Sequence, residues 1–413
     1  MKSILYFIPR YDPQLMGNRI HAEVIRHWRA RGVDAEVISL DARAPRLVTE
    51  EHEGIVAHRL PVGAGLPLKA ANRALDALLH YPYLAGALYH YRRFIAARRY
   101  DLVHIETAFP LGLVATLAGR DHPPLAVTLP GADIMAEPEF DYGYGRFAAV
   151  RSLLPLVFRR AAVLRADSPQ IRSLAVRLGA QPDKVTAIPY NITEDSYPPP
   201  GLALAELRAR SRAEVAARHG LDPARPIVVS LNRLHPFKGI AYLVEAVPHV
   251  EQAGARPQVL IVGPNRTTPR FGDYGAFVRR RAEELGVAES VIFTGGVPHD
   301  QTLGYLAAAD AVVVPSVAES FSRVVVEAAA AGTPAVVTRT TGVSDYVAEA
   351  GCGLVVEPRS GEAIGAALAR LLRDGELWRG LASRCPEFAG QFRSEKIAAE
   401  LLDLYRRSIP SAT

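Results

Sequence analysis

The chain has little cysteine and no long apolar run, and both shortages narrow what it can be. Only two cysteines occur, Cys352 and Cys385, too few for a disulfide framework and not part of a zinc-binding cluster. No stretch approaches the roughly 18 apolar residues of a transmembrane helix. The first apolar run, 4–8, is shorter than a signal-peptide core and reads as a buried strand. We therefore expect a cytoplasmic protein that does not span a membrane but can lie peripherally on its inner face.

Acidic residues are scarce between residues 61 and 100. That stretch holds six cations and one acid, a local excess equal to the net charge of +5 of the whole sequence. Its second half is rich in aromatic residues, namely Tyr81, Tyr83, Tyr89, Tyr91, Phe94 and Tyr100. Arginine and tyrosine together suit an interface with anionic lipid or a lipid-linked sugar. Two interpretations stay open: a peripheral contact with an anionic membrane through 81–100, or a helix with solvated cations whose tyrosines pack on a sheet.

Short apolar runs alternate with longer helical patterns along the chain, which is typical of βαβ units and parallel sheets. The helical patterns include 20–31, 83–99, 202–219, 239–252, 277–285, 300–309, 322–331 and 394–408. The predicted strands are 3–8, 34–40, 55–60, 102–105, 125–129, 162–166 and 185–188, then 227–231, 258–262, 291–294, 311–315, 335–338 and 353–356. The fold class is therefore α/β.

Three consecutive prolines, 198–200, break this rhythm near the middle of the chain. Such a run fits neither a helix nor a central strand, so it marks a domain edge. The expected organisation is an N-terminal domain (1–195), a linker and helix (196–224), a C-terminal domain (225–392) and a final helix (393–413) that packs back on the first domain. Two α/β halves imply a cleft, with ligands at the carboxyl ends of the strands.

Two permanent cations stand five residues apart where the first strand of the second half gives way to a helix. The strand ends in SLNRL (230–234) and the helix opens after HPFKG (235–239), so Arg233 and Lys238 lie in the loop between them. The amino end of a helix adds about half a positive charge. A forked guanidinium, an ammonium and a helix end together form a receptor for a diphosphate. The competing interpretation is a surface loop with two solvated cations.

A second motif, ESFSRVVVE, runs from Glu319 to Glu327 and follows the apolar strand 311–315. Glu319 is therefore expected in the loop at the carboxyl end of that strand. Ser320 or Ser322 is expected to cap the helix that follows. Glu327 falls about two turns into this helix, where a carboxylate among valines and alanines is costly without partners such as sugar hydroxyls. The alternatives are a salt-bridged helix acid for Glu327 and a surface loop acid for Glu319.

These motifs, in this order and spacing, resemble the nucleotide-sugar domain of glycosyltransferase family 4. The matching stretches are SLNRLHPFKG (230–239), VLIVG (259–263), VIFTGGV (291–297), ADAVVVPS (309–316), ESFSRVVVEAAAAGTPAV (319–336) and GCGLVVEP (351–358). The ordered set covers about half of the chain. The resemblance implies a GT-B fold, in which two Rossmann-like domains face each other across a cleft. It also implies that the first domain binds the acceptor and the second the nucleotide sugar.

The resemblance further implies side-chain roles in the second half. It assigns Arg233 and Lys238 to the diphosphate and Glu319 to hydroxyls of the donor sugar, and these three form the expected catalytic set. It assigns Glu327 to the ribose hydroxyls.

The remaining donor contacts implied by the resemblance are made by main-chain groups. Those at Ser320, Phe321 and Ser322 would touch the sugar and the distal phosphate, and those near Val297 would recognise the base. The family usually has glycine where Ser322 stands. A hydroxymethyl group there would either crowd the sugar or cap the helix and add a donor.

The first half resembles the family more loosely. Gly17-Asn18 stands where the family prefers two glycines in the first loop, and Gly17 would let the backbone approach the donor phosphate. His21 follows on the next helix. Pro130 replaces a histidine that often contacts the donor sugar in the family. Asp133 remains, and we expect it to bind donor or acceptor hydroxyls.

The expected reaction is transfer of a hexose-type sugar, with retention, from a nucleotide-diphosphate donor to a glycan, lipid-linked or small-molecule acceptor. Negative charge builds up on the leaving diphosphate, and fixed cations and helix dipoles stabilise it. No metal or other cofactor is expected, because no DxD sequence stands where a metal–diphosphate site would need it. No residue stands out as the nucleophile of a double displacement, so front-face substitution is favoured. No nucleic-acid partner is expected.

Other functions stay open. A catalytically impaired nucleotide-sugar-binding protein would keep the donor site without turnover, and Pro130 in place of histidine supports that alternative. A GT-B sugar-nucleotide epimerase would need acid and base residues around the sugar, and no clear set is present. A dehydrogenase is disfavoured because no GxGxxG follows the first strand.

Overall fold

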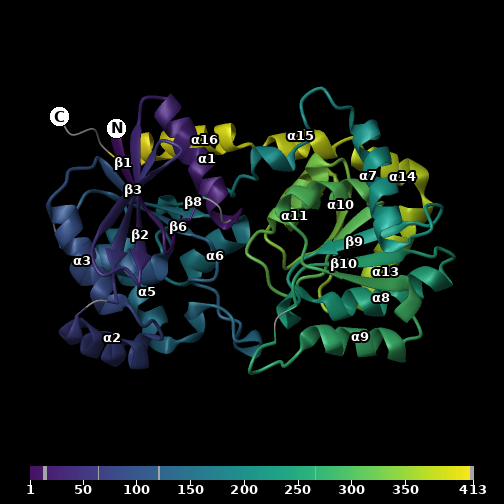
Figure 1. Cartoon of the computed structure of the whole chain (residues 1–413), viewed down its shortest axis with the longest axis horizontal. Coiled ribbons are helices and arrows are strands. Elements are labelled where there is room, and N and C mark those ends of the chain that lie inside the picture. Colours follow the sequence, from purple (N-terminus) through teal and green to yellow (C-terminus); the bar gives the residue numbers. More distant parts are fainter. Residues whose placement is uncertain (13–15, 64, 120, 266, 410–413) are drawn as a thin grey trace. The chain divides into compact units, whose positions relative to one another are not determined.

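The computed structural model describes residues 1–12, 16–63, 65–119, 121–265 and 267–409, which form two compact units (Figure 1). Unit 1 holds Met1–Tyr190 and the C-terminal segment that begins at Ser394, and unit 2 holds Asn191–Arg393. Each unit is built around a mainly parallel sheet. The chain passes from one unit to the other within a few residues of the expected domain boundaries.

Unit 1 contains an eight-stranded sheet in the order β3-β4-β2-β1-β5-β6-β7-β8. Its strands are β1 (Ser3–Phe7), β2 (Asp34–Asp41), β3 (Val48–His52), β4 (Ile55–Pro61), β5 (Leu102–Glu106), β6 (Leu125–Leu129), β7 (Val163–Ala166) and β8 (Val185–Ala187). All neighbours are parallel except the pair β3–β4. The strand order reverses between β1 and β5, and in open parallel sheets such a switch point is where ligands bind.

The edge strand β3 is not predicted by the sequence pattern. Its sequence, VTEEH, contains no apolar run and none of its residues is fully buried. It joins β4 through a tight turn at Glu53 and Gly54, which have φ values of 51° and 79°. Positive φ at both central residues matches the right-handed twist of a two-residue hairpin. The strand is therefore specified by its turn and by its partner rather than by an apolar pattern of its own.

Unit 2 contains a six-stranded parallel sheet in the order β11-β10-β9-β12-β13-β14. Its strands are β9 (Ile227–Leu231), β10 (Gln258–Val262), β11 (Val291–Gly295), β12 (Ala311–Val314), β13 (Ala335–Thr338) and β14 (Gly353–Val356). The order reverses between β9 and β12. In both units, the strands predicted from apolar runs are present with ends that differ by at most one residue.

Helices cover both sheets. Those of unit 1 are α1 (Met16–Ala30), α2 (Leu66–Leu79), α3 (Leu84–Ala96), α4 (Leu113–Leu117), α5 (Ala148–Arg160), α6 (Pro169–Arg177) and α16 (Ser394–Ser408). Those of unit 2 are α7 (Leu204–His219), α8 (Ile240–Gln252), α9 (Tyr274–Glu284), α10 (Thr302–Ala308), α11 (Arg323–Ala330), α12 (Ser344–Ala350), α13 (Gly361–Arg373), α14 (Gly375–Ala382) and α15 (Cys385–Gly390). None of the helices formed by the described residues is both long and apolar enough to cross a membrane.

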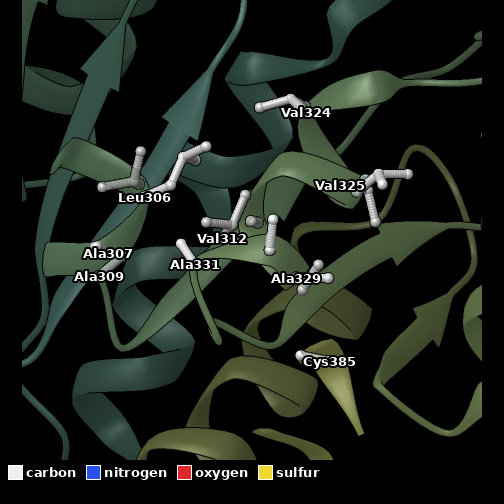
Figure 2. Packing of buried hydrophobic residues seen from close by; sticks show 14 of the residues in the cluster. Leu306, Ala307, Ala309, Val312, Val324, Val325, Ala329, Ala331 and Cys385 are labelled. Atoms are coloured by element: carbon white, nitrogen blue, oxygen red, sulfur yellow. The ribbon is translucent and has the colours of Figure 1, made fainter. Parts of the chain in front are cut away.

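Small side chains let α11 pack close to the sheet of unit 2. Ala329 and Ala331 belong to the same buried cluster as Leu306, Val312 and Val325 (Figure 2). The alanine run after Glu327 therefore supports close packing of α11 within the core of unit 2.

α16 completes unit 1, although it follows unit 2 in the chain. Its apolar face joins the unit-1 core through Ile397, Leu401 and Tyr405. Trp28 of α1 donates its indole N–H to the carbonyl of Ala398 at 2.9 Å. The C-terminal helix thus packs back on the N-terminal part of the chain.

Candidate functional site

The cationic turn of unit 2 lies at the carboxyl end of β9. Arg233 is exposed two residues beyond the strand, and Lys238 closes a short 3-10 turn, Pro236–Lys238, that leads into α8. Gly239 follows in the left-handed region, with φ 67°, at the N-cap of α8. Both cations predicted to hold a diphosphate therefore lie at the edge where a parallel sheet binds its ligands.

The ring of Phe237 contacts both cations. The Arg233 guanidinium carbon lies 5.3 Å from the ring centroid and Lys238 Nζ lies 5.0 Å from it, within the range of cation–π attraction. His235 adds no third charge at neutral pH, because burial and the charges of Arg233 and Lys238 lower its pKa to about 4. The turn therefore presents two positive charges gathered around one buried aromatic ring.

Backbone packing fixes this turn to the end of β12. The amide of Val317 donates to the carbonyl of Phe237 at 2.8 Å. A Cβ added to Gly239 would lie 2.0 Å from the carbonyl oxygen of Pro315, so a larger residue would force the two segments apart. The cations are thus held beside the switch point between β9 and β12.

Glu319 lies in the loop after β12, in contact with the cationic turn. Its carboxylate forms an ion pair with Lys238 Nζ, and the two side chains are only 14% and 12% exposed. The loop after β13 holds the backbone of Glu319, which donates to Thr340 O at 3.2 Å and accepts from the amide of Gly342 at 2.9 Å. The structure therefore brings together the two residues predicted to bind the diphosphate and the donor sugar.

The start of α11 contains a strained residue, Ser322, with φ 84° and ψ 85°. Residues other than glycine rarely adopt positive φ, which is the physical reason that glycine suits this position. No side-chain hydrogen bond caps α11, so the prediction that a serine caps this helix is wrong. Phe321 is buried and its carbonyl accepts from the amide of Val343 at 3.0 Å. Ser320, between Glu319 and Phe321, is partly buried.

Glu327 lies on α11, partly buried, and burial raises its pKa despite the nearby charges of Arg323 and His299. Within the described part of the chain it forms no ion pair, which argues against a salt-bridged helix acid. A carboxyl group with a raised pKa is typical of a functional site. Val297, predicted to lie near the base, is partly buried in the loop between β11 and α10.

Three further polar groups, which the sequence analysis missed, lie at the same strand ends. Ser230 Oγ, Asn232 Nδ2 and Ser316 Oγ are buried and have no hydrogen-bond partner among the described residues. Buried polar groups are nearly always paired with protein, water or ligand. Their place at the ends of β9 and β12 marks a polar site at the switch point. A serine and an asparagine that close an otherwise apolar strand are the signal that could have revealed it.

In unit 1, the residues predicted from the looser resemblance have different surroundings. Gly17 is exposed in the first turn of α1, and a Cβ there would meet no atom within 4 Å. Residues 13–15 of the expected first loop lie outside the described residues. His21 is buried, and its Nδ1 shares a hydrogen bond of 2.8 Å with the hydroxyl of Tyr6. Pro130 is partly buried just after β6.

A buried polar cluster surrounds Glu106, the last residue of β5. Its Oε1 accepts from the Tyr6 hydroxyl at 2.5 Å and lies 2.9 Å from His104 Nε2, and its Oε2 accepts from the Tyr190 hydroxyl. His21 Nδ1 is 3.7 Å from Oε1. Burial opposes ionisation of Glu106, but the charge of His21 and the hydrogen bond from His104 lower its pKa overall.

Sequence reasoning identified only His21 of this cluster. The available signal was the strand LVHIE, in which His104 and Glu106 occupy alternate positions and therefore share one face. Thr107, the next residue, has a φ of 134°, a value that costs strain for a residue with a Cβ. Strain beside a buried acid at a strand end is typical of a functional site.

Asp133, which we expect to bind sugar hydroxyls, does not face solvent. It is 1% exposed, and its Oδ2 accepts from the amide of Ala108 at 2.6 Å. Its Oδ1 is buried and has no hydrogen-bond partner within the described ranges. Burial raises the pKa of this carboxyl group to about 7. In this structure Asp133 holds the backbone that follows β5.

The aromatic residues of segment 81–100 divide between core and surface. Tyr91 and Phe94 are buried, which supports the interpretation that they pack on the sheet. Tyr89 is 47% exposed. Arg98 places its guanidinium carbon 3.9 Å from the Phe94 ring centroid, and Arg92 is exposed.

The residues that the structure describes contain no group of three or more His, Cys, Asp or Glu side chains arranged to hold a metal ion. Cys352 and Cys385 are both free and buried.

Solved structures with the same fold are GT-B glycosyltransferases. Sucrose-phosphate synthase from Thermosynechococcus elongatus superimposes with a TM-score of 0.76 at 23% identity, covering 98% of this chain and 99% of that one. Anabaena HepE, in complex with UDP and glucose, gives 0.70 at 19% identity, covering 98% and 99%. The two sheets of this chain therefore form the GT-B fold.

Sequence relatives specify the family. Residues 17–191 match the Glycosyl transferase 4-like domain, and residues 211–387 match Glycosyl transferases group 1. The chain belongs to glycosyltransferase family 4. It is 30% identical to a GDP-mannose-dependent alpha-(1-6)-phosphatidylinositol monomannoside mannosyltransferase of Mycobacterium tuberculosis, over 98% of this chain and 94% of that protein. It is also 34% identical to a D-inositol 3-phosphate glycosyltransferase of Segniliparus rotundus, over 51% of this chain and 46% of that protein.

Gly239→Ala should weaken both the fold of unit 2 and nucleotide binding. The added methyl group would meet the Pro315 carbonyl and strain a positive φ, at an expected cost of about 1–3 kcal/mol in unfolding free energy. Thermal unfolding with and without GDP measures both effects. Gly380→Ala is the matched control, because a Cβ there meets no atom within 4 Å. Equal unfolding temperatures for the two variants would contradict the close approach.

Asp133→Asn should change how stability depends on pH. The raised pKa means that Asp133 contributes stability below its unfolded pKa of about 3.9 and loses it as pH rises to about 7. Relative to the variant, the wild type should therefore become less stable between pH 4 and 7, at ~1.4 kcal/mol per pKa unit. Chemical denaturation across this range measures the difference. A constant difference would show that the carboxyl group ionises freely.

Proposed function

We propose that this enzyme moves a hexose, with retention, from a nucleoside-diphosphate donor to an acceptor that carries an inositol phosphate group, most simply a lipid-linked one. One observation supports the assignment of a nucleoside-diphosphate donor. Lys238 forms an ion pair with Glu319 next to Arg233, and the turn that carries both cations packs against the end of β12 at the switch point of unit 2. The full-length relative named as GDP-mannose-dependent makes GDP-mannose the first donor to test.

In this proposal the cationic turn holds the diphosphate. Arg233 supplies a forked pair of donors and Lys238 a point charge. The Phe237 ring contacts both cations and the Glu319 carboxylate pairs with Lys238 before any anion binds, so little reorganisation is needed when charge develops. Asn232 Nδ2 is a further donor at the same strand end.

The pair formed by Lys238 and Glu319 links the two ends of the bond that breaks. Glu319 accepts hydrogen bonds from hydroxyls of the donor sugar, while Lys238 stabilises the phosphate that leaves. Main-chain groups at Ser320 and Ser322 complete this surface, and Glu327 accepts from the ribose.

Retention is proposed through front-face substitution. The acceptor hydroxyl attacks from the side on which the diphosphate leaves, and a phosphate oxygen takes its proton. Glu319 is engaged by Lys238, and an ion-paired carboxylate is a poor nucleophile for a double displacement. Glu106 is the other buried acid near a strand end, and three hydroxyl or imidazole groups already satisfy it.

The acceptor is proposed from the two named relatives. One name specifies a phosphatidylinositol monomannoside and the other an inositol 3-phosphate, which share an inositol phosphate unit. An acceptor of this kind, if lipid-linked, implies a cytoplasmic enzyme in peripheral contact with an anionic membrane. The exposed cations of segment 81–100 are one candidate for that contact.

Arg233→Ala should lower kcat/KM for sugar transfer by about 10²–10³-fold, the effect of removing one preorganised donor to a developing negative charge. Release of nucleoside diphosphate from GDP-mannose in the presence of phosphatidylinositol measures it. Arg256→Ala is the matched control, since Arg256 is exposed near the opposite, amino end of β10. Unchanged rates for Arg233→Ala would remove the diphosphate assignment.

Chelation should leave the activity intact. The two cations and the start of α8 neutralise the leaving diphosphate, so the reaction needs no divalent ion. Transfer rates are compared before and after dialysis against EDTA. Loss of activity that manganese restores would overturn the metal-free mechanism.

A further inference from the structure

A cavity of about 690 Å³ opens at the amino edge of the unit-1 sheet. Its lining runs from the end of α3 into the segment before β5 and returns through the segment between α4 and β6. Tyr100 and Pro123, each two residues before its strand, belong to this lining, whereas Glu106 ends β5 at the opposite edge. Open parallel sheets bind their substrates at the carboxyl ends of the strands. This amino-edge cavity therefore lies away from the position expected for the reacting groups.

Three arginines line the amino-edge cavity, namely Arg92 on α3 and Arg98 and Arg99 just after it. Their guanidinium groups form no ion pair and no hydrogen bond with any residue that the structure describes. Arg98 is partly buried, and its guanidinium carbon lies 3.9 Å from the ring centroid of Phe94. This contact with the ring holds the cation in place and leaves its N–H donors unused.

Arginines in two other polar cavities are engaged in ion pairs. In a cavity of about 510 Å³ in unit 2, Arg212 pairs with Asp310 at 2.8 Å. In a cavity of about 560 Å³ in unit 1, Arg59 pairs with Glu50. Those cations have partners within the fold, whereas the three of the amino-edge cavity are available to a ligand.

The amino-edge cavity carries a net charge of +2 at neutral pH. Asp121 is the single acid of its described lining, against the three arginines. His122 adds no charge, because burial lowers its pKa. A phosphate monoester carries about −1.5 to −2 charges at pH 7, which matches this excess better than the single charge of a carboxylate does.

An acid close to Arg98 does not neutralise the cavity. A hydrogen bond with His58 lowers the pKa of Glu36, and the charge of Arg98 adds a smaller effect in the same direction. Glu36 nevertheless forms no ion pair with Arg98 in the described part of the chain. Its Oε2 accepts from the Tyr100 hydroxyl at 2.5 Å and lies 3.2 Å from His58 Nε2. The carboxylate is therefore satisfied by other groups.

A buried hydrogen bond fixes one wall of the cavity. His122 Nδ1 donates to the Pro123 carbonyl at 2.8 Å, so Nε2 is the acceptor for the Tyr91 hydroxyl, 2.6 Å away. Tyr91 belongs to α3, is fully buried and stacks on Phe7 with 4.6 Å between the ring centroids. These contacts hold α3 against the segment before β6, so the cavity is formed before a ligand binds.

We propose that the amino-edge cavity binds the phosphate group of a small organic phosphate monoester. A guanidinium group pairs with phosphate through parallel N–H donors, and three such groups line this one space. The volume of about 690 Å³ lies in the range of small-molecule sites, and Ile95 and Pro123 offer apolar surface for the organic part. A planar membrane surface does not enter a cavity, so a soluble ester is favoured over a lipid head group.

Protection from chemical labelling tests the site in the full-length protein. Phenylglyoxal modifies accessible arginines, and peptide mass spectrometry locates them. Glucose 6-phosphate should slow the labelling of Arg92, Arg98 and Arg99 several-fold, whereas neutral glucose should not. Labelling of Arg93, an exposed neighbour outside the cavity lining, should stay unchanged. The same protection is expected in Arg233→Ala, because the donor site proposed in unit 2 is a separate one.

Two results of this experiment would overturn the proposal. One is unchanged labelling of the three arginines in the presence of either glucose 6-phosphate or inorganic phosphate. The other is protection by inorganic phosphate alone, which would reduce the cavity to a site for a simple ion.

Calorimetric titration of variants tests the charge balance. Arg98→Gln should weaken the binding of glucose 6-phosphate about tenfold, the loss expected of one charge-assisted contact. Asp121→Asn should strengthen it several-fold, because it removes the acid of the lining. The matched control, Arg93→Gln, should bind like the wild type. Equal affinities of Arg98→Gln and the wild type, or weaker binding by Asp121→Asn, would contradict the assignment.

Vesicles distinguish the soluble ester from a lipid head group. The labelling is repeated with phosphatidylcholine vesicles that contain phosphatidylglycerol. Arg92, Arg98 and Arg99 should then react at the rate seen without vesicles. Protection of these arginines by anionic vesicles, without protection by glucose 6-phosphate, would assign them to a membrane contact and overturn the proposal.

Discussion

Two like charges on one turn are the feature on which the proposed donor site depends. Arg233 and Lys238 repel each other, and in an unsupported loop they would spread into solvent. Three contacts oppose this: the ring of Phe237, the carboxylate of Glu319, and the packing of Gly239 against Pro315. Each lies at the carboxyl ends of β9 and β12. The protein therefore meets the cost of bringing these charges to one turn during folding, and in the proposed function an anionic ligand relieves their repulsion.

The carboxyl edges of both sheets also hold strained backbone. Ser322 follows β12 with φ 84°, and Thr107 follows β5 with φ 134°. Each such residue costs about 1–3 kcal/mol, and such strain persists where the surroundings determine it. Ser322 is held by the loop after β13 through its neighbours Glu319 and Phe321. Thr107 lies between two anchored residues. Glu106 before it belongs to the buried polar cluster, and the amide of Ala108 after it donates to Asp133.

The carboxyl edges of the two sheets differ in their polar groups. Unit 2 gathers cations, acids and unpaired buried polar groups at one strand edge, which suits a nucleotide sugar. Unit 1 instead holds a buried polar cluster around Glu106 at its strand ends.

Much of the fold could be predicted from the sequence because apolar periodicity is a local signal. The buried strands of both sheets and the close packing of the alanines in α11 follow from it. The motifs around Arg233, Lys238 and Glu319 could be placed at strand ends for the same reason. The strand β3 could not, because its polar sequence gains its structure from β4.

Tertiary structure alone decided the environment of the polar residues. It buried Asp133 under the backbone after β5 and left α11 without a side-chain cap. It also brought Tyr6 and Tyr190 from distant parts of the chain to Glu106. It divided the aromatic residues of segment 81–100, so that Tyr91 and Phe94 are buried whereas Tyr89 is exposed. Sequence periodicity shows which face of an element is apolar, but only packing shows whether that face meets the core or the surroundings.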